Sequence, residues 1–255
     1  MLKQLFKKSL QFVLGKESGL YLRLYHLYKP SRFPSLNHLI DTYAKQKEEI
    51  VFVQIGANEG QVEDPIYYHI RMSNWRGILV EPQQAEFELL KKNYRHSAHL
   101  HFEQLAISDR VGERKFYYIE KDKGNVPHWV SKLSSFDESI PRQVLERYPQ
   151  AQISHTMVQC TTLMELLAKH QIEKLDFLMI DTEGHDYEIL KTLDLDRYRP
   201  EVIIFENNHL SKSDYQAALD QLSAKGYLHY QFDYNTASFT HTELVQSYRT
   251  QLLVH

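Results

Sequence analysis

Four titratable side chains crowd into residues 181–186, directly after a short apolar run. They are Asp181, Glu183, His185 and Asp186. Carboxylates held close together raise one another's pKa, and a histidine among them can exchange protons near neutral pH. We therefore predict that Asp181, Glu183 or His185 acts as a general base on a hydroxyl group. Two alternatives stay open: Asp181, Glu183 and Asp186 hold a divalent metal ion, or the segment only caps a helix that begins near Asp186.

A second polar cluster, Glu206-Asn207-Asn208-His209, follows the next apolar run of the chain. The carboxyl ends of parallel strands meet at one edge of a sheet, so we expect this cluster beside residues 181–186. Glu206 and His209 are predicted to bind or orient the molecule that loses the proton. The alternative is an ordinary polar loop.

Residues 54–60 (QIGANEG) form a loop with two glycines after the first apolar run. Only nine of the 255 residues are glycine, and Gly56 and Gly60 are two of them. Glycine allows a sharp turn and lets a ligand approach main-chain amides. Ala57 breaks the G-x-G-x-x-G dinucleotide pattern, and the G-K-[ST] ending of a phosphate-binding loop is absent. The loop therefore favours a nucleoside without phosphates, with an ordinary strand–helix turn as the alternative.

Glu81 ends the second apolar run, 25 residues after Gly56. A carboxylate has two acceptor oxygens, so it can accept a hydrogen bond from each hydroxyl of a ribose. Together with the glycine loop, Glu81 predicts that a bound nucleoside is held by its ribose. Taken alone, it could equally be an exposed acid at a strand end.

Apolar runs and helical patterns alternate along most of the chain, which is typical of an α/β protein. Strands are predicted at 49–55, 77–81, 100–107, 175–180 and 202–205. The nearly continuous apolar run at 49–55 predicts a strand buried on both faces, and buried strands are also expected at 175–180 and 202–205. Helices are predicted at 36–47, from Asp64-Pro65 onward, and at 84–94, 162–170, 186–195 and 211–225, with a closing hairpin at 227–232 and 237–241. The pattern favours an open, mostly parallel, Rossmann-like sheet with helices on both faces. A TIM barrel is less favoured because the chain has too few βα units.

The domain organisation follows from where this alternation begins and breaks. Residues 1–34 carry seven lysines and arginines against one acid, with apolar residues at helical spacing, and predict a basic N-terminal helical arm. Residues 35–255 predict one domain with an insertion at about 109–160 over the sheet edge. We expect the arm to contact the body or a second subunit, and contact with an anionic membrane surface is the alternative.

Composition excludes several classes of protein. The chain is 25% charged and 12% aromatic, so it is not disordered. Its single cysteine, Cys160, excludes an internal disulfide and a zinc site built on several cysteines. Because it has no membrane-spanning apolar run and no convincing signal peptide, we expect a cytoplasmic protein, peripheral to a membrane if the arm binds one. A net charge of −3 argues against a nucleic-acid partner.

Several of these segments resemble the FkbM family of S-adenosylmethionine-dependent methyltransferases. The resemblance rests on VQIGANEG (53–60), GILVEP (77–82), LAISDRVGERKFY (105–117), SSF (134–136), LDFLMIDTEGHDYEILKTLD (175–194) and IIFEN (203–207). It covers roughly residues 35–235 and leaves out the arm. It implies the class I methyltransferase fold, a seven-stranded sheet whose terminal hairpin is reversed.

The resemblance also implies a site for S-adenosylmethionine. Its residues would be Gln54, Gly56, Ala57, Asn58 and Gly60 at the methionine portion and ribose, Glu81 and Pro82 at the ribose, Ala106, Ile107 and Asp109 at the adenine, and Asp181 near the methyl group. Many enzymes of this fold have an acid where Gln54 stands, so we expect Glu59 or Asp181 to supply the charge for the methionine ammonium. Ser134 and Ser135 are expected beside the methyl acceptor.

The combined expectation is an S-adenosylmethionine-dependent methyltransferase that acts on a hydroxyl of a sugar or another small hydroxylated acceptor, with no metal required. Two alternatives remain: a non-catalytic binding module on a degenerate methyltransferase fold, and a nucleotide-dependent oxidoreductase. Nucleic-acid methylation is not expected, because the body is acidic and the [DN]-P-P-[YFW] motif is absent.

Overall fold

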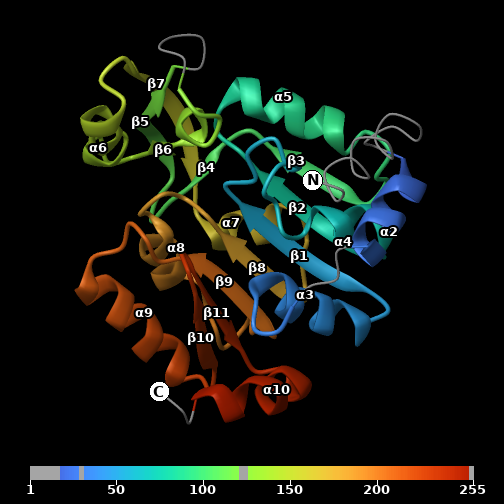
Figure 1. Cartoon of the computed structure of the whole chain (residues 1–255). Helices are drawn as coiled ribbons and strands as arrows, with labels where there is room; N and C mark the ends of the chain where they lie inside the picture. The colour runs from blue at the N-terminus through green and yellow to red at the C-terminus, as the bar shows by residue number, and fades with distance from the viewer. Residues whose placement is uncertain (1–17, 29–31, 121–125, 253–255) are drawn as a thin grey trace.

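A computed structural model describes residues 18–28, 32–120 and 126–252 of the chain (Figure 1). The helical pattern predicted for residues 1–17 lies outside these ranges, as do residues 29–31 of the arm and 121–125 of the insertion. Among the described helices, none has the length and apolar character needed to cross a membrane.

A seven-stranded sheet forms the centre of the molecule. Its strands lie in the order β10 (Leu228–Phe232), β11 (Asn235–Phe239), β9 (Val202–Glu206), β8 (Phe177–Ile180), β1 (Ile50–Ile55), β2 (Trp75–Val80) and β3 (Leu100–Glu103). Neighbouring strands are parallel except for β11, which runs antiparallel to both β9 and β10. The predicted mostly parallel sheet with a reversed terminal hairpin is therefore confirmed.

The central strands are buried on both faces. All residues of β1 and β8 are buried. Their side chains point alternately to two apolar clusters, because successive residues of a strand face opposite sides of the sheet. Phe52 and Phe177 belong to one cluster, and Val53 and Leu178 to the other. This two-sided burial explains why these strands are continuous apolar runs in the sequence.

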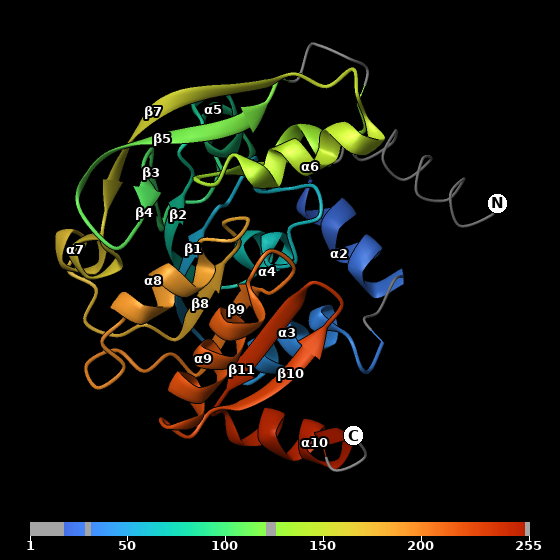
Figure 2. The same cartoon turned by 90° about the vertical axis from the view of Figure 1, so that its left-hand side faces the viewer.

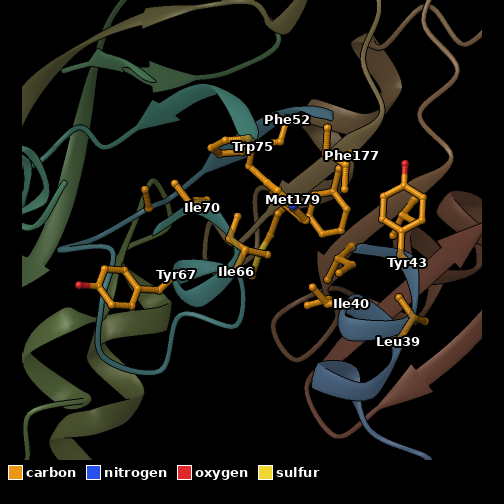
Figure 3. Packing of buried hydrophobic residues seen from close by; sticks show 14 of the residues in the cluster. Leu39, Ile40, Tyr43, Phe52, Ile66, Tyr67, Ile70, Trp75, Phe177 and Met179 are labelled. Carbon is orange, nitrogen blue, oxygen red and sulfur yellow. The ribbon is translucent and has the colours of Figure 1, made fainter. Parts of the chain in front are cut away.

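Helices cover both faces of the sheet and give three layers (Figure 2). One face is covered by α2 (Gly19–Tyr28), α3 (Leu36–Lys45), α4 (Tyr67–Met72), α5 (Gln84–Asn93) and α10 (Thr242–Leu252). The other face is covered by α7 (Leu163–Lys169), α8 (Asp186–Thr192) and α9 (Lys212–Ser223). Figure 3 shows the first face, where Trp75 and Phe177 of the sheet lie among side chains of α3 and α4. Tyr21 and Leu22 of α2, the described part of the predicted arm, are buried in the same cluster.

The insertion forms a second sheet above one end of the first (Figure 2). Its strands lie in the order β4 (Ala106–Ile107), β7 (Ile153–Thr161), β5 (Gly112–Ile119) and β6 (Ser134–Ser135), with η1 (Val130–Lys132) and α6 (Ser139–Arg147) beside them. The long antiparallel pair of β5 and β7 runs from Gly112↔Cys160 to Ile119↔Ile153. The insertion is thus a folded layer that faces the carboxyl ends of the main strands.

One strand prediction near the insertion was wrong, and one strand was missed. Residues 100–107 are not one strand, because β3 pairs in the main sheet and β4 pairs with β7 in the second. Strand β7 was not predicted, since most of its residues are partly or fully exposed and its sequence has no apolar run.

Two element boundaries differ from prediction, and one helix was missed. Helix α4 begins at Tyr67, and Asp64 instead holds a turn ahead of it, where Oδ1 accepts a hydrogen bond from Ile66 N at 2.9 Å. Strand β11 starts two residues earlier than expected, since it pairs with β9 from Asn235 onward. Helix α10 was not predicted, although its Leu244 and Tyr248 are fully buried.

Candidate functional site

The glycine loop after β1 joins the carboxyl ends of three neighbouring strands. The amides of Gly56 and Ala57 donate to Val80 O of β2 at 3.0 Å, and Asp181 N after β8 donates to Ile55 O at 2.9 Å. Gly56 has a φ of +78°, and a Cβ atom there would lie 1.8 Å from the main-chain oxygen of Asp181. Only glycine fits this position, which explains why a residue so scarce in this chain occupies it.

Glu81 lies immediately after β2 and is 3% exposed. Its Oε2 accepts a hydrogen bond from Asn58 N at 2.9 Å, and its Oε1 accepts one from Gln83 N at 2.8 Å. These two bonds fix the Glu81 carboxylate beside the glycine loop. Asn58 has a left-handed φ of +50°, a conformation that asparagine tolerates better than most residues.

A cavity of about 240 Å³ opens at the carboxyl ends of β1, β2 and β8. Open α/β sheets bind their ligands at this edge. The cavity brings together most of the residues singled out from the sequence, namely Gln54, Gly56, Ala57, Asn58, Glu81, Pro82, Ala106, Ile107, Ser134, Asp181 and Glu183. The insertion supplies much of the facing wall, including Trp129, Lys132 and Phe136, which sequence reasoning did not single out.

Gln54 and Asp64 form one polar end of the cavity. Gln54 is 3% exposed, its side chain hydrogen-bonds Asp64, and its Oε1 has no hydrogen-bond partner among the described residues. Burial raises the pKa of Asp64 to about 6, although the hydrogen bonds from Ile66 N, Gln54 and Tyr94 oppose this rise. A buried acceptor without a donor costs about 1–3 kcal/mol. The Oε1 atom therefore indicates a place where a bound donor fits.

Lys132 connects the insertion to the glycine loop. Its Nζ lies 2.9 Å from Glu59 Oε1 and 3.0 Å from Val62 O. Glu59 is thus paired with Lys132 and is not part of the cavity lining. The negative charge beside Gln54 therefore comes from Asp64 rather than from Glu59. Asp64 was predicted only as a helix cap, and no pattern in the sequence singles out Lys132.

Asp181 lines the cavity directly after β8. Burial, followed by the nearby carboxyls of Glu183 and Asp186, raises the pKa of Asp181 well above its ordinary value. A raised pKa brings a carboxyl closer to the range in which a general base works best near neutral pH.

Asp186 is fully buried, and both of its carboxylate oxygens accept hydrogen bonds from neighbouring residues. Its Oδ2 accepts from Thr182 Oγ1 at 2.8 Å, and its Oδ1 accepts from Glu206 N at 3.0 Å. These bonds tie the segment after β8 to the end of β9. Both oxygens of this carboxylate, which was considered as a metal ligand, therefore already accept hydrogen bonds from the protein.

A family model described as the methyltransferase FkbM domain matches residues 54–229, well over half of the chain. The chain belongs to the FkbM methyltransferase family. Its strand order, with β11 reversed, is that of the class I methyltransferase fold, as the resemblance implied.

Solved structures similar to this FkbM chain are also methyltransferases. The FkbM methyltransferase of Methylobacillus flagellatus KT has a TM-score of 0.49 and 12% identity, over 76% of this chain and 44% of that one. The N-terminal domain of human METTL16 has a TM-score of 0.42 and 14% identity, over 87% and 71%. The precorrin-6y C5,15-methyltransferase of Geobacter metallireducens GS-15 has a TM-score of 0.39 and 13% identity, over 83% and 92%. This chain thus spans less than half of the Methylobacillus chain, and no curated protein sequence matches it.

Two residues that the FkbM resemblance assigned to the cofactor lie outside the cavity lining. Gly60 packs against Leu90 and Tyr94, where a Cβ atom would approach their side chains to 2.4 and 2.6 Å. Asp109 is exposed, and its carboxylate accepts from Ser108 Oγ at 2.9 Å. Gly60 shapes the loop from behind, and Asp109 faces solvent.

His185 faces the second sheet rather than the cavity. Its Nε2 lies 3.2 Å from Ser108 Oγ and 3.3 Å from Arg114 Nη1, and its ring packs edge-on against Phe136 with centroids 4.9 Å apart. Burial, and then the charge of Arg114, lower the pKa of His185 to about 4. A histidine in these surroundings stays neutral at pH 7 and is a weak base, so Asp181 is the better placed candidate.

The remaining predicted residues meet beside the cavity. His209 Nε2 lies 3.0 Å from Glu183 Oε2 and 4.0 Å from Glu206 Oε1. Burial, followed by the charges of Glu183, Asp181 and Asp186, raises the pKa of Glu206 to about 10. Ser135 is buried, and its Oγ donates to Glu183 O at 2.7 Å. Of the two serines, only Ser134 lies in the cavity lining.

Proposed function

We propose that the protein is an S-adenosylmethionine-dependent methyltransferase that methylates a hydroxyl of a sugar or another small hydroxylated acceptor. Membership of the FkbM family supports methyl transfer. The observation that carries the cofactor assignment is the buried Oε1 of Gln54, which has no donor among the described residues and lies beside Asp64 in the cavity lining.

The polar end of the cavity fits the methionine portion of this cofactor. An ammonium group offers several N–H donors and one positive charge. Gln54 supplies an unused acceptor, and Asp64 supplies an acceptor with a negative charge. The pair thus replaces the single acid that the resemblance led us to look for. A bound cation would also favour the ionised form of Asp64 and lower its pKa.

The rest of the cavity fits a nucleoside. Glu81, fixed by two main-chain amides, accepts hydrogen bonds from the ribose hydroxyls. Ala106 and Ile107 of β4 provide an apolar wall for the adenine. Gly56 leaves room at the loop because it has no side chain.

The chemistry then needs alignment and a base. S-adenosylmethionine, when bound, supplies a methyl group to a nucleophilic oxygen, and the electron pair of the broken carbon–sulfur bond stays on sulfur. The Asp181 carboxylate takes the proton of the acceptor hydroxyl. A positioned base contributes roughly 10²–10⁴-fold in rate, and alignment of the reactants contributes up to about 7–11 kcal/mol.

The insertion supplies the acceptor side. Trp129 lines the cavity and is 48% exposed, so it presents an aromatic surface on which a sugar ring packs. Phe136 lies on the same wall. Aromatic surfaces beside carboxylates suit a small molecule that is both polyhydroxylated and partly apolar.

Binding of S-adenosylhomocysteine, the cofactor product, tests the proposal first. We expect it to raise the melting temperature of the protein, and no shift at saturation contradicts the proposal. Turnover is then measured as S-adenosylhomocysteine formed with a panel of sugars and glycosides. Asp181→Asn is expected to bind S-adenosylhomocysteine but to lose about 10²–10⁴-fold in turnover.

The control for Asp181→Asn is Asp196→Asn, which changes an aspartate that is 83% exposed and is not part of the cavity lining. We expect this control to keep full turnover. Full turnover by Asp181→Asn, with intact cofactor binding, would show that Asp181 is not the base. Cofactor binding without turnover of any acceptor would favour the non-catalytic alternative.

A further inference from the structure

Glu183, Glu206 and His209 converge where β8 and β9 end. One ligand atom from each of the three side chains lies within 4.8 Å of the others, and no other such group of three was found among the described residues. The closest approach is 3.0 Å, between His209 Nε2 and Glu183 Oε2. Glu206 Oε1 lies 4.0 Å from the same nitrogen.

Glu206 provides a second observation that points to a ligand. The residue is 9% exposed, and its carboxyl group faces His209. Its Oε2 is buried and has no hydrogen-bond partner within the part of the chain that the structure describes. Burying a carboxyl group without a partner is costly unless a counter-charge, a proton or a metal ion accompanies it.

We propose that Glu183, Glu206 and His209 bind a divalent first-row metal ion. Two ligand atoms that each lie about 2.1 Å from one ion are about 3.0 Å apart at a right angle and about 4.2 Å apart on opposite sides. The observed separations of 3.0 and 4.0 Å are close to these two values. Small rotations of the side chains therefore suffice to complete the site.

The donor set selects among the metals. Two carboxylates favour hard ions such as Mg²⁺, Ca²⁺ and Mn²⁺, whereas an imidazole favours Zn²⁺ and other transition metals. Mn²⁺ and Zn²⁺ accept both kinds of ligand. An ion with charge +2 balances the two carboxylates. Three protein ligands also leave coordination positions open for water or for an oxygen of a bound molecule.

The position of this ion gives it a role in activating the methyl acceptor, and this role depends on the proposed methyl transfer. Glu183 lines the cavity two residues after Asp181, so the ion would lie on the acceptor side. A hydroxyl bound to a divalent ion has a lowered pKa and gives up its proton more readily. This set differs from the ligands considered from the sequence, since Asp186 is used by Thr182 and the amide of Glu206.

Mn²⁺ binding to the full chain, without cofactor, tests the site. Free Mn²⁺ gives an electron paramagnetic resonance signal that falls when the ion binds protein. We expect the wild type to remove one equivalent of Mn²⁺, and Zn²⁺ to release it again. Glu206→Gln and His209→Gln should each weaken Mn²⁺ binding at least tenfold. His170→Gln is the matched control, because His170 lies 2.6 Å from Glu103 in a carboxylate–histidine pair outside the cavity lining, and its Mn²⁺ affinity should stay unchanged.

The outcomes separate this inference from the proposed function. The metal site is refuted if the wild type leaves the free Mn²⁺ signal unchanged, if both Glu206→Gln and His209→Gln bind as the wild type does, or if His170→Gln loses binding equally. Thermal unfolding of each variant shows whether it is folded, and a pair of folded variants is required for the comparison. S-adenosylhomocysteine binding is measured separately, so its presence without Mn²⁺ binding removes only the metal site.

Discussion

The contact between Gly56 and the end of β8 yields a quantitative prediction. In Gly56→Ala, the new Cβ atom would lie 1.8 Å from Asp181 O, whereas real Cβ contacts stay beyond about 3.0 Å. The glycine loop and β8 must therefore separate by roughly 1.2 Å. Such a shift weakens the bonds from Gly56 N to Val80 O (3.0 Å) and from Asp181 N to Ile55 O (2.9 Å).

The expected cost combines backbone strain with these weakened bonds. A non-glycine residue at positive φ costs about 1–2 kcal/mol. Each lost hydrogen bond costs about 0.5–1.5 kcal/mol net. We therefore expect Gly56→Ala to lower the free energy of unfolding by about 2–5 kcal/mol. Because the same shift moves the loop relative to Asp181, affinity for S-adenosylhomocysteine should fall at least tenfold.

Gly226→Ala is the control that isolates the contact. Gly226 has nearly the same backbone angle, with a φ of +83°, but a Cβ atom there would approach only Arg199 Nη2, at 3.2 Å. That atom ends a flexible side chain, so only the strain of about 1–2 kcal/mol is expected, with unchanged cofactor-product affinity. Urea unfolding followed by fluorescence gives the stabilities, and titration calorimetry gives the affinities.

The difference between the two alanine variants tests whether the contact of Gly56 with Asp181 O shapes the site. If Gly56→Ala and Gly226→Ala unfold within about 0.5 kcal/mol of each other and bind S-adenosylhomocysteine equally, the contact with Asp181 O does not shape the site, and the reasoning is refuted. The threshold corresponds to the usual error of such comparisons between independent sites.

Three further variants test one side chain of the cavity lining and two that lie outside it. Asp64→Asn should stabilise the ligand-free protein at pH 7 by at most about 3 kcal/mol, because the contribution of the Asp64 carboxyl to stability is lost as pH rises from 3.8 to about 6. The variant should also weaken cofactor-product binding, and unchanged values of both stability in urea unfolding and affinity in calorimetry contradict this. The pKa of His185 falls from 6.5 to about 4, so the contribution of His185 to stability should fall by about 2 kcal/mol between pH 7 and pH 5, because the unfolded chain binds the proton more tightly. His185→Gln should lack this contribution, and equal pH slopes of the wild type and His185→Gln in urea unfolding speak against a buried neutral histidine. Ser135→Ala removes the hydrogen bond to Glu183 O, so it should lower the free energy of unfolding by about 1 kcal/mol and reduce turnover, with cofactor-product affinity unchanged. Ser139→Ala, on the surface of α6, is the control and should change neither the free energy of unfolding nor turnover.

Strands that are buried on both faces could be predicted because nearly every residue of such a strand is apolar. Strands β1, β8 and β9 are nearly continuous apolar runs, and the sheet they form is mostly parallel with the predicted terminal hairpin. Strand β7 has no such apolar run, because most of its residues are partly or fully exposed. The division of residues 100–107 between two sheets likewise depends on the pairing of β4 with β7, which are far apart in the chain.

For the site, the sequence by itself determined which residues stand at strand ends. The glycine loop, Glu81 and residues 181–186 follow three apolar runs, and parallel strands bring their carboxyl ends to one edge. Membership of the FkbM family could be predicted from these same segments. The order of residues along the chain is enough for this prediction, because the end of a strand can be recognised from the residues next to it in the sequence.

Only the tertiary structure decided which of these groups face the cavity. Asp64 and Lys132 reach it from segments whose sequences predict a helix cap and a loop, because burial and packing across the chain orient them. His185 is turned away by Ser108 and Phe136, which come from the second sheet. Two oxygens, one of Gln54 and one of Glu206, lack a hydrogen-bond partner among the described residues, and the sequence does not reveal this because it depends on how distant segments pack.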